Sequence, residues 1–252
     1  MILRRLVAAL AALMLAGLAP PALAADTQVA VAANFAEPAK EIAAAFAAAT
    51  GHKATLAFGS SGQFYAQMAR GAPFEVFLSA DVERPKKVEQ DGLGVPGTRF
   101  TYAIGRLALY SKTPGLVDGQ GAILRSGRFA KLAIADPAAA PYGVAAVQTL
   151  QKLGVYSTVK PKIVLGTSIA QAYQFTATGA AELGFVALSQ VMENGKLREG
   201  SAWQVPGSMH EPIRQDAIVL NSGKDNEAAT ELMKYLRADK ARAIIRSYGY
   251  SF

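Results

Sequence analysis

Short apolar runs alternate with segments of helical periodicity along most of the chain. The apolar runs have the length and the flanking turn residues of buried strands. A repeated strand–helix order is typical of α/β proteins with mostly parallel sheets. The predicted strands cover residues 28–32, 54–58, 75–79, 105–110, 131–135, 162–165, 183–186 and 216–220.

Helical periodicity is clearest between the first two predicted strands. Ala39, Ile42, Ala43 and Phe46 recur there at the spacing of one helix face. Gly51 follows as a stop signal. The same reasoning predicts helices over residues 61–70, 143–153, 169–179, 226–235 and 239–247.

Two strand-like segments, residues 103–110 and 214–220, could take the chain from one lobe to another and back. Two lobes joined by crossing strands form a hinge architecture. We therefore expect a two-lobed α/β fold, with a mostly parallel sheet flanked by helices in each lobe. Lobe I is expected to hold residues 25–103 and 216–252, and lobe II residues 104–215.

Four predicted strands run into helix starts that have small, hydroxyl or amide side chains. The first N–H groups of a helix have no intrahelical acceptor, and the helix dipole favours an anion there. None of the four starts contains Lys, Arg or His, so their convergence would create an anion site built from neutral donors. The four starts are Ala33-Asn34, Gly59-Ser60-Ser61, Pro141-Tyr142-Gly143 and Thr167-Ser168-Ile169.

The N-terminus has the pattern of a secretory signal peptide that spans residues 1–24. Arg4 and Arg5 precede the apolar run 6–18, and Ala22-Leu23-Ala24 has the form of a cleavage site. A membrane anchor is the alternative, but the run is too short to span a bilayer and Pro20-Pro21 interrupts it.

Cysteine is absent from the sequence, so the exported protein is expected to have no lipid anchor at its cleavage point and to be soluble. The formal charge is +7, or +5 without Arg4 and Arg5. Lys and Arg are scattered among Asp and Glu with no basic, aromatic-rich run, which argues against a nucleic-acid partner. A solvated basic surface with a mild field that attracts anions is the favoured interpretation.

The sequence offers little for catalysis or for metal ligation. His52 and His210 lack neighbours at metal-ligand spacing, and both are expected on the surface. Asp81 is interpreted as a helix cap and Asp136 as a turn residue. No phosphate-binding loop, dinucleotide fingerprint or nucleophile elbow follows a strand. We expect a protein that is not an enzyme and has no cofactor.

A family resemblance rests on five segments, residues 29–35, 58–62, 71–81, 134–143 and 246–250. The Ser60-Ser61 loop and the Phe-Leu-Ser-Ala-Asp segment at residues 77–81 are its most specific parts. Through these segments the chain resembles the periplasmic molybdate-binding proteins of ABC uptake systems, over nearly all of residues 25–252. The resemblance implies a periplasmic-binding-protein-like fold, a periplasmic location and delivery of molybdate or tungstate to a membrane permease. We expect a monomer.

The resemblance also implies how the oxyanion is held between the lobes, by hydroxyls and by backbone N–H groups. Its direct contacts fall on Asn34, Ser61, Tyr142 and Ile169, with Ala33, Ser60 and Ser168 in support. Two positions depart from the ligand residues of that family and leave the identity of the ion open. Ala33 stands where one subgroup has a Thr ligand, and Ala187 stands where another subgroup has a Tyr ligand. The Tyr142 hydroxyl could compensate for Ala187, or it could pack against the opposite lobe.

Two alternatives stay open from the sequence. The first is an enzyme on the same scaffold that acts on a small carboxylate, for example by isomerising aconitate, although the four helix starts lack the cations that a tricarboxylate needs. The second is a binding protein for sulfate, phosphate or an organic anion. Phosphate keeps a proton near neutral pH and favours a site with a carboxylate acceptor, which these starts lack. A sensory role is not distinguished from transport.

Overall fold

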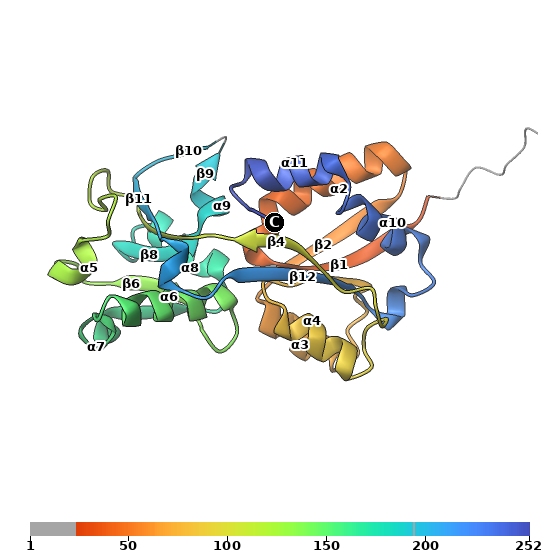
Figure 1. Cartoon of the computed structure of the whole chain (residues 1–252), viewed down its shortest axis with the longest axis horizontal. Coiled ribbons are helices and arrows are strands. Elements are labelled where there is room, and N and C mark those ends of the chain that lie inside the picture. Colours follow the sequence, from red (N-terminus) through yellow and green to blue (C-terminus); the bar gives the residue numbers. More distant parts are fainter. Residues whose placement is uncertain (1–23, 194) are drawn as a thin grey trace, which may run out of the picture.

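The structure is a computed structural model that describes residues 24–193 and 195–252, so almost all of the expected signal peptide lies outside the described residues. Two five-stranded sheets form two lobes side by side (Figure 1). The predicted two-lobed α/β fold is confirmed. The sheets are mixed and not mostly parallel as expected, because β12 in one sheet and β5 in the other, on the paths that join the lobes, run antiparallel to both neighbours. In the first sheet β1 pairs in parallel with β2 and β3, and β12 is antiparallel to both β3 and β4.

The first lobe is built around the sheet of order β2-β1-β3-β12-β4. Its strands are β1 (Asp26–Ala32), β2 (Lys53–Gly59), β3 (Val76–Leu78), β4 (Phe100–Gly105) and β12 (Ile213–Val219). Its helices are α2 (Ala36–Thr50), α3 (Ser61–Met68), α4 (Glu83–Gln90), α10 (Glu227–Tyr235) and α11 (Asp239–Ser247), with the 3-10 turns η1 (Ala33–Phe35) and η4 (Asn221–Gly223).

Alternating side chains of the first sheet enter two separate cores, as the period of two along a strand requires. Val29 and Val31 pack with Phe46 of α2 and with residues of α10 and α11. Ala30 packs on the other face with Phe64 of α3 and residues of α4. Figure 1 shows α2, α10 and α11 on one side of the sheet and α3 and α4 on the other.

The second lobe is built around the sheet of order β11-β5-β8-β6-β7. Its strands are β5 (Leu107–Ser111), β6 (Leu132–Ala135), β7 (Ile163–Gly166), β8 (Leu183–Ala187) and β11 (Ser201–Gln204), beside the small hairpin β9 (Met192–Glu193) and β10 (Lys196–Leu197). Its helices are α5 (Ile123–Ser126), α6 (Pro141–Lys152), α7 (Tyr156–Val159), α8 (Ile169–Ala177) and α9 (Leu188–Val191), with η2 (Lys160–Lys162) and η3 (Gly207–Met209).

The chain passes between the lobes twice. It leaves the first sheet at the end of β4 and enters β5 almost at once, and it returns from β11 into β12. Figure 1 shows β4 and β12 side by side between the lobes, and they pair antiparallel, with a register irregularity between Gln215 and Asp216. The lobe boundaries expected from the sequence stay a prediction, because β4 and β12 pair in the region where one lobe passes into the other.

Two sequence-based expectations about single residues can be compared with the structure. The surface position expected for His52 is wrong: the side chain is 4% exposed, stacks on Phe46 and accepts a hydrogen bond from the Ala25 backbone N–H. The capping interpretation of Asp81 is confirmed, because its carboxylate accepts from the Arg84 backbone N–H at 2.9 Å in the first turn of α4.

The crossing strands are fastened by a buried carboxylate. Asp216 is 1% exposed and accepts from the Arg99 guanidinium at 2.6 Å and from the Thr101 hydroxyl at 2.7 Å. Since Thr101 lies on β4 and Asp216 on β12, these contacts hold the two strands together beside the irregular register.

We expect Arg99→Met to lower the free energy of unfolding by about 2–3 kcal/mol, because it leaves the Asp216 carboxylate buried without its cation. Lys87→Met is the matched control, since it breaks the Lys87–Asp91 pair, an exposed ion pair that is screened by solvent and contributes little. Denaturant titration of both variants measures the difference. Equal losses would show that the Arg99–Asp216 pair contributes no more than a surface pair.

Candidate functional site

The four predicted helix starts converge on one small hollow between the lobes. The hollow measures about 200 Å³ when the space open to solvent is included. Six of the seven residues expected at the site line it, and Ser168 does not. The lining comprises Ala32, Ala33, Asn34, Gly59, Ser60, Ser61, Ala80, Ala140, Pro141, Tyr142 and Ile169.

Two of the serines serve their own helices. Ser60 is the N-cap of α3 in a capping box: its hydroxyl accepts from the Gln63 N–H, and the Gln63 side chain accepts from the Ser60 N–H. Ser168 caps α8 by accepting from the Gln171 N–H. These hydroxyls fix where the helices begin, so the N–H groups of Ser61 and Ile169, at the first position of each helix, have no intrahelical acceptor.

Ser61 keeps a donor available. Its hydroxyl oxygen accepts from the Ala80 backbone N–H at 2.9 Å, and the side chain is buried. A hydroxyl has one hydrogen and two lone pairs. The contact with Ala80 therefore holds the oxygen in place while the hydrogen can be donated to a ligand in the hollow.

Asn34 has already used the donors of its side chain. The two hydrogens of its amide nitrogen go to Gln215 Oε1 at 2.9 Å and to the Tyr250 hydroxyl at 3.1 Å. An amide nitrogen has only two hydrogens. What Asn34 can offer to the hollow as a donor is therefore its backbone N–H.

The Tyr142 hydroxyl is directed to the hinge strands. It accepts from Gln215 Nε2 at 3.3 Å. Burial, with smaller contributions from Tyr250 and Tyr102, raises the pKa of Tyr142 well above its usual value. The residue also lines the hollow, and as the second residue of α6 it has a backbone N–H without an intrahelical acceptor.

The hollow is electrically neutral in its side chains. None of the lining residues is Asp, Glu, Lys, Arg or His. Within residues 24–193 and 195–252 no group of three potential metal ligands is found. The arrangement can therefore surround a small anion with N–H and O–H donors, and it offers no acid–base pair for catalysis.

Direct hydrogen bonds join the lobes next to the hollow. The Gly62 N–H donates to the Ala139 carbonyl at 3.0 Å, and Arg84 Nη2 donates to the Ala138 carbonyl at 3.1 Å. A Cβ on Gly62 would lie 3.0 Å from Ala139 Cα, so glycine permits this close approach. The lobes are thus in contact on the α3 side of the hollow.

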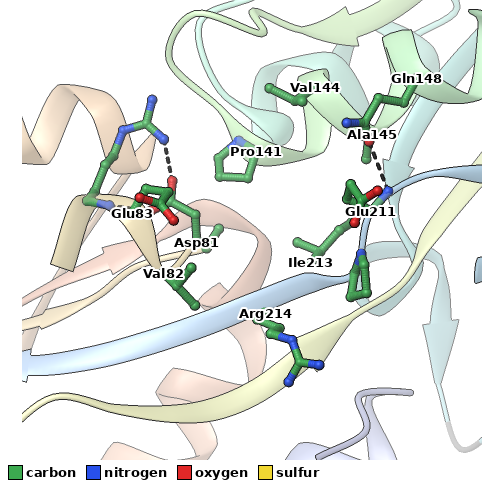
Figure 2. Close-up of a pocket in the computed structure, with 13 residues that line it drawn as sticks. Asp81, Val82, Glu83, Pro141, Val144, Ala145, Gln148, Glu211, Ile213 and Arg214 are labelled. Atoms are coloured by element: carbon green, nitrogen blue, oxygen red, sulfur yellow. Dashed lines mark hydrogen bonds and ion pairs between the residues drawn. The ribbon is translucent and has the colours of Figure 1, made fainter. Parts of the chain in front are cut away.

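A wider cleft opens beside the hollow and shares Ala80 and Pro141 with it. It encloses about 770 Å³ including its open mouth. Figure 2 shows Asp81 and Glu83 on one side, Val144 and Gln148 of α6 on the other, and Arg214 of β12 along the floor. Because this cleft has charged side chains of both signs and an open mouth, it is less suited than the hollow to enclosing a small anion.

Most of the residues that support the site could not have been found from the sequence. Gln215, Tyr250, Tyr102 and Ser189 support Asn34 and Tyr142, and Gln190 donates to the Ile169 carbonyl. Only Tyr250 carried a signal, as part of the terminal segment of the family resemblance.

The comparisons with known proteins agree with this architecture. The sequence profile of the family described as bacterial extracellular solute-binding protein matches residues 27–251. The chain is 57% identical to the molybdate-binding protein ModA of Azotobacter vinelandii over 98% of this chain and 97% of that protein. It is 55% identical to ModA of Rhodobacter capsulatus over 93% of this chain and 91% of that protein.

The chain belongs to the bacterial extracellular solute-binding proteins. A solved periplasmic molybdate-binding protein of Azotobacter vinelandii superposes on this solute-binding protein with a TM-score of 0.87, at 42% identity, covering 90% of this chain and 99% of that one. The family resemblance inferred from the sequence is confirmed. These three relatives are named as binding proteins and not as enzymes.

The buried tyrosines of this solute-binding protein predict a loss of stability at alkaline pH. Burial raises the pKa of Tyr250 to about 12, against smaller opposing effects of its hydrogen bonds with Ser189, Asn34 and Tyr142. The unfolded side chain ionises near pH 10, so the stabilisation is complete below about pH 10 and is lost as the pH rises toward 12. One buried tyrosine with this pKa contributes about 3 kcal/mol to the free energy of unfolding.

Denaturant titrations between about pH 9 and pH 12 test this expectation, with Tyr250→Phe as the comparison. As the pH rises, the free energy of unfolding of the wild type should fall more steeply than that of Tyr250→Phe. The difference in slope should correspond to one additional proton released on unfolding. Parallel curves would mean that Tyr250 ionises equally readily in the folded protein.

Proposed function

We propose that this solute-binding protein captures molybdate or tungstate in the hollow between its lobes and delivers it to the membrane permease of an ABC uptake system. The observation that carries the proposal is the convergence of four helix starts on one uncharged hollow. The names of the two relatives above 50% identity support molybdate as the ligand. The N-terminal signal pattern and the periplasmic relatives support a periplasmic location.

The ligand chemistry follows from the donors. A tetrahedral dianion has only acceptor oxygens at neutral pH and is satisfied by N–H and O–H groups without a counter-charge. We assign the contacts to the Ser61 hydroxyl and to backbone N–H groups of Asn34, Ser61, Tyr142 and Ile169. Ala33, Ser60 and Ser168 shape the helix starts. Sulfate has the same charge and shape, so its rejection would depend on the size of the hollow.

The enzyme alternative receives less support. A tricarboxylate such as aconitate needs cationic partners, and the lining residues include none.

Within the described residues no helix is both long and apolar enough to cross a bilayer. We also propose that the protein acts as a monomer without a cofactor, so that the permease is its macromolecular partner.

Thermal denaturation with a panel of anions tests the ligand. Molybdate and tungstate should raise the melting temperature, because a ligand at about 100 times its dissociation constant adds about 2.7 kcal/mol to the free energy of unfolding. Sulfate, phosphate and citrate at equal concentration are the controls. Stabilisation by citrate or aconitate, with none by molybdate, would replace the transport proposal by the enzyme alternative.

The two serines of the loop provide a matched pair of variants. Ser61→Ala removes a hydroxyl donor from the hollow and should weaken molybdate binding by about tenfold or more, since a hydrogen bond to a charged group contributes about 1.5–3 kcal/mol. Ser60→Ala removes the cap of α3 and should mainly lower stability, by about 1 kcal/mol. Calorimetric titration of both variants decides between these effects. Equal dissociation constants for the two would refute the assignment of Ser61 as the donor.

A further inference from the structure

Gln215 is the residue that links the two sides of the hollow from behind. It lies on the crossing strand β12, is fully buried, and occupies the position where the pairing with β4 changes register. Its Oε1 accepts from Asn34 Nδ2 at 2.9 Å and from the Tyr102 hydroxyl at 3.0 Å, and its Nε2 donates to the Tyr142 hydroxyl at 3.3 Å. Asn34 belongs to the first lobe and Tyr142 to the second, and both line the hollow.

The hydrogen bonds of this network have one consistent direction. Because Oε1 faces the Asn34 amide nitrogen, Nε2 must face Tyr142, so the Tyr142 oxygen accepts from it. The Tyr250 hydroxyl in turn donates to the Asn34 carbonyl at 2.7 Å. Gln215 therefore links Asn34 to Tyr142, and Tyr250 holds Asn34 at both its side-chain amide and its carbonyl.

The network closes on the backbone that faces the hollow. The Asn34 carbonyl also accepts from the Ser189 hydroxyl of the second lobe at 2.9 Å. With its side-chain amide and its carbonyl both held, Asn34 has little freedom to rotate, and its backbone N–H is fixed in direction. The N–H of Tyr142 is fixed in the same way, because the ring is clamped at its hydroxyl.

The packing around Gln215 leaves no room for another arrangement. A Cβ on Gly105 of β4 would lie 2.1 Å from the Tyr142 hydroxyl and 2.5 Å from Gln215 Nε2. The two polar groups thus rest directly on the backbone of the crossing strand. A change in the hinge strands must displace them, and their displacement must move the donors at the hollow.

We propose that Gln215 is a positioning residue for the ion: it touches no ligand, and from the hinge strand it orients Asn34 and Tyr142 so that their donors converge on the hollow. This inference depends on the proposed function, because the ion is the molybdate or tungstate of that proposal. It goes further by assigning the affinity for the ion partly to a residue outside the hollow.

The test is a double-mutant cycle with Gln215→Met and Tyr142→Phe, using calorimetric titration of molybdate. Each single variant should weaken binding by about tenfold, the value of one hydrogen bond in a charged site. The double variant should bind molybdate about as weakly as the weaker single variant, because both changes break the same chain of bonds.

The wild-type titration in the same series distinguishes the two proposals. If the wild type does not bind molybdate, both the proposed function and the positioning role are refuted. If the wild type binds molybdate and Gln215→Met binds it equally well, only the positioning role is refuted.

Two further variants separate positioning from general stability. Thr176→Val removes a buried hydroxyl bond in α8 away from the hollow and should lower the melting temperature without changing the dissociation constant. If Gln215→Met fails to fold, Tyr102→Phe carries the test. The one hydroxyl hydrogen of Tyr102 is shared between Gln215 Oε1 and the Ser79 carbonyl, and its loss should weaken binding by about threefold. An unchanged dissociation constant in Gln215→Met, or in Tyr102→Phe where that variant takes its place, would overturn the proposal. The proposal would also be overturned if the loss of affinity in the double variant equalled the product of the losses in Gln215→Met and Tyr142→Phe.

Discussion

Backbone N–H groups at the start of a helix have no acceptor within that helix, and this protein brings several such starts to one point. The α/β topology makes this possible, because helices that follow parallel strands begin at the carboxyl edge of the sheet. Each lobe contributes two starts, and the gap between the lobes becomes a hollow surrounded by donors. Ser60 and Ser168 cap their own helices and so set where α3 and α8 begin. The remaining architecture serves to hold these starts at the right separation.

The hollow stays neutral because its supports are neutral too. Asn34, Gln215, Tyr142, Tyr250 and Ser189 form a buried set in which hydroxyls and amides satisfy one another. A buried polar group without a partner would cost about 1–3 kcal/mol, so the set is stable only when it is complete. A charged side chain in this network would attract or repel the ion without touching it, and it would need a buried partner of opposite charge. A neutral network fixes the geometry without adding a charge that protons could titrate near neutral pH.

Much of this fold could be predicted from the sequence, because local patterns determine it. The 239–247 helix, the Gly51 stop and the two helix starts capped by Ser60 and Ser168 follow from periodicity and capping residues. Short elements such as α5, α7 and β11 have four residues each, too few to show a period. The burial of His52 and the contact between Asn34 and Gln215 depend on residues that are 27 and 181 positions apart in the chain. No local signal marks such partners, and only the three-dimensional arrangement reveals them.

The balance between holding and releasing a ligand depends on the direct bonds that join the lobes beside the hollow. Among them are the hydrogen bonds from Gly62 to Ala139, from Arg84 to Ala138 and from Ser189 to Asn34, together with the Gln215–Tyr142 and Ser189–Tyr250 contacts. A neutral hydrogen bond of this kind contributes only about 0.5–1.5 kcal/mol net. A ligand that accepts bonds from both lobes adds its differential contacts to the closed state and so shifts the balance toward closure. A partner that separates the lobes has to break these bonds together with the contacts of the ion.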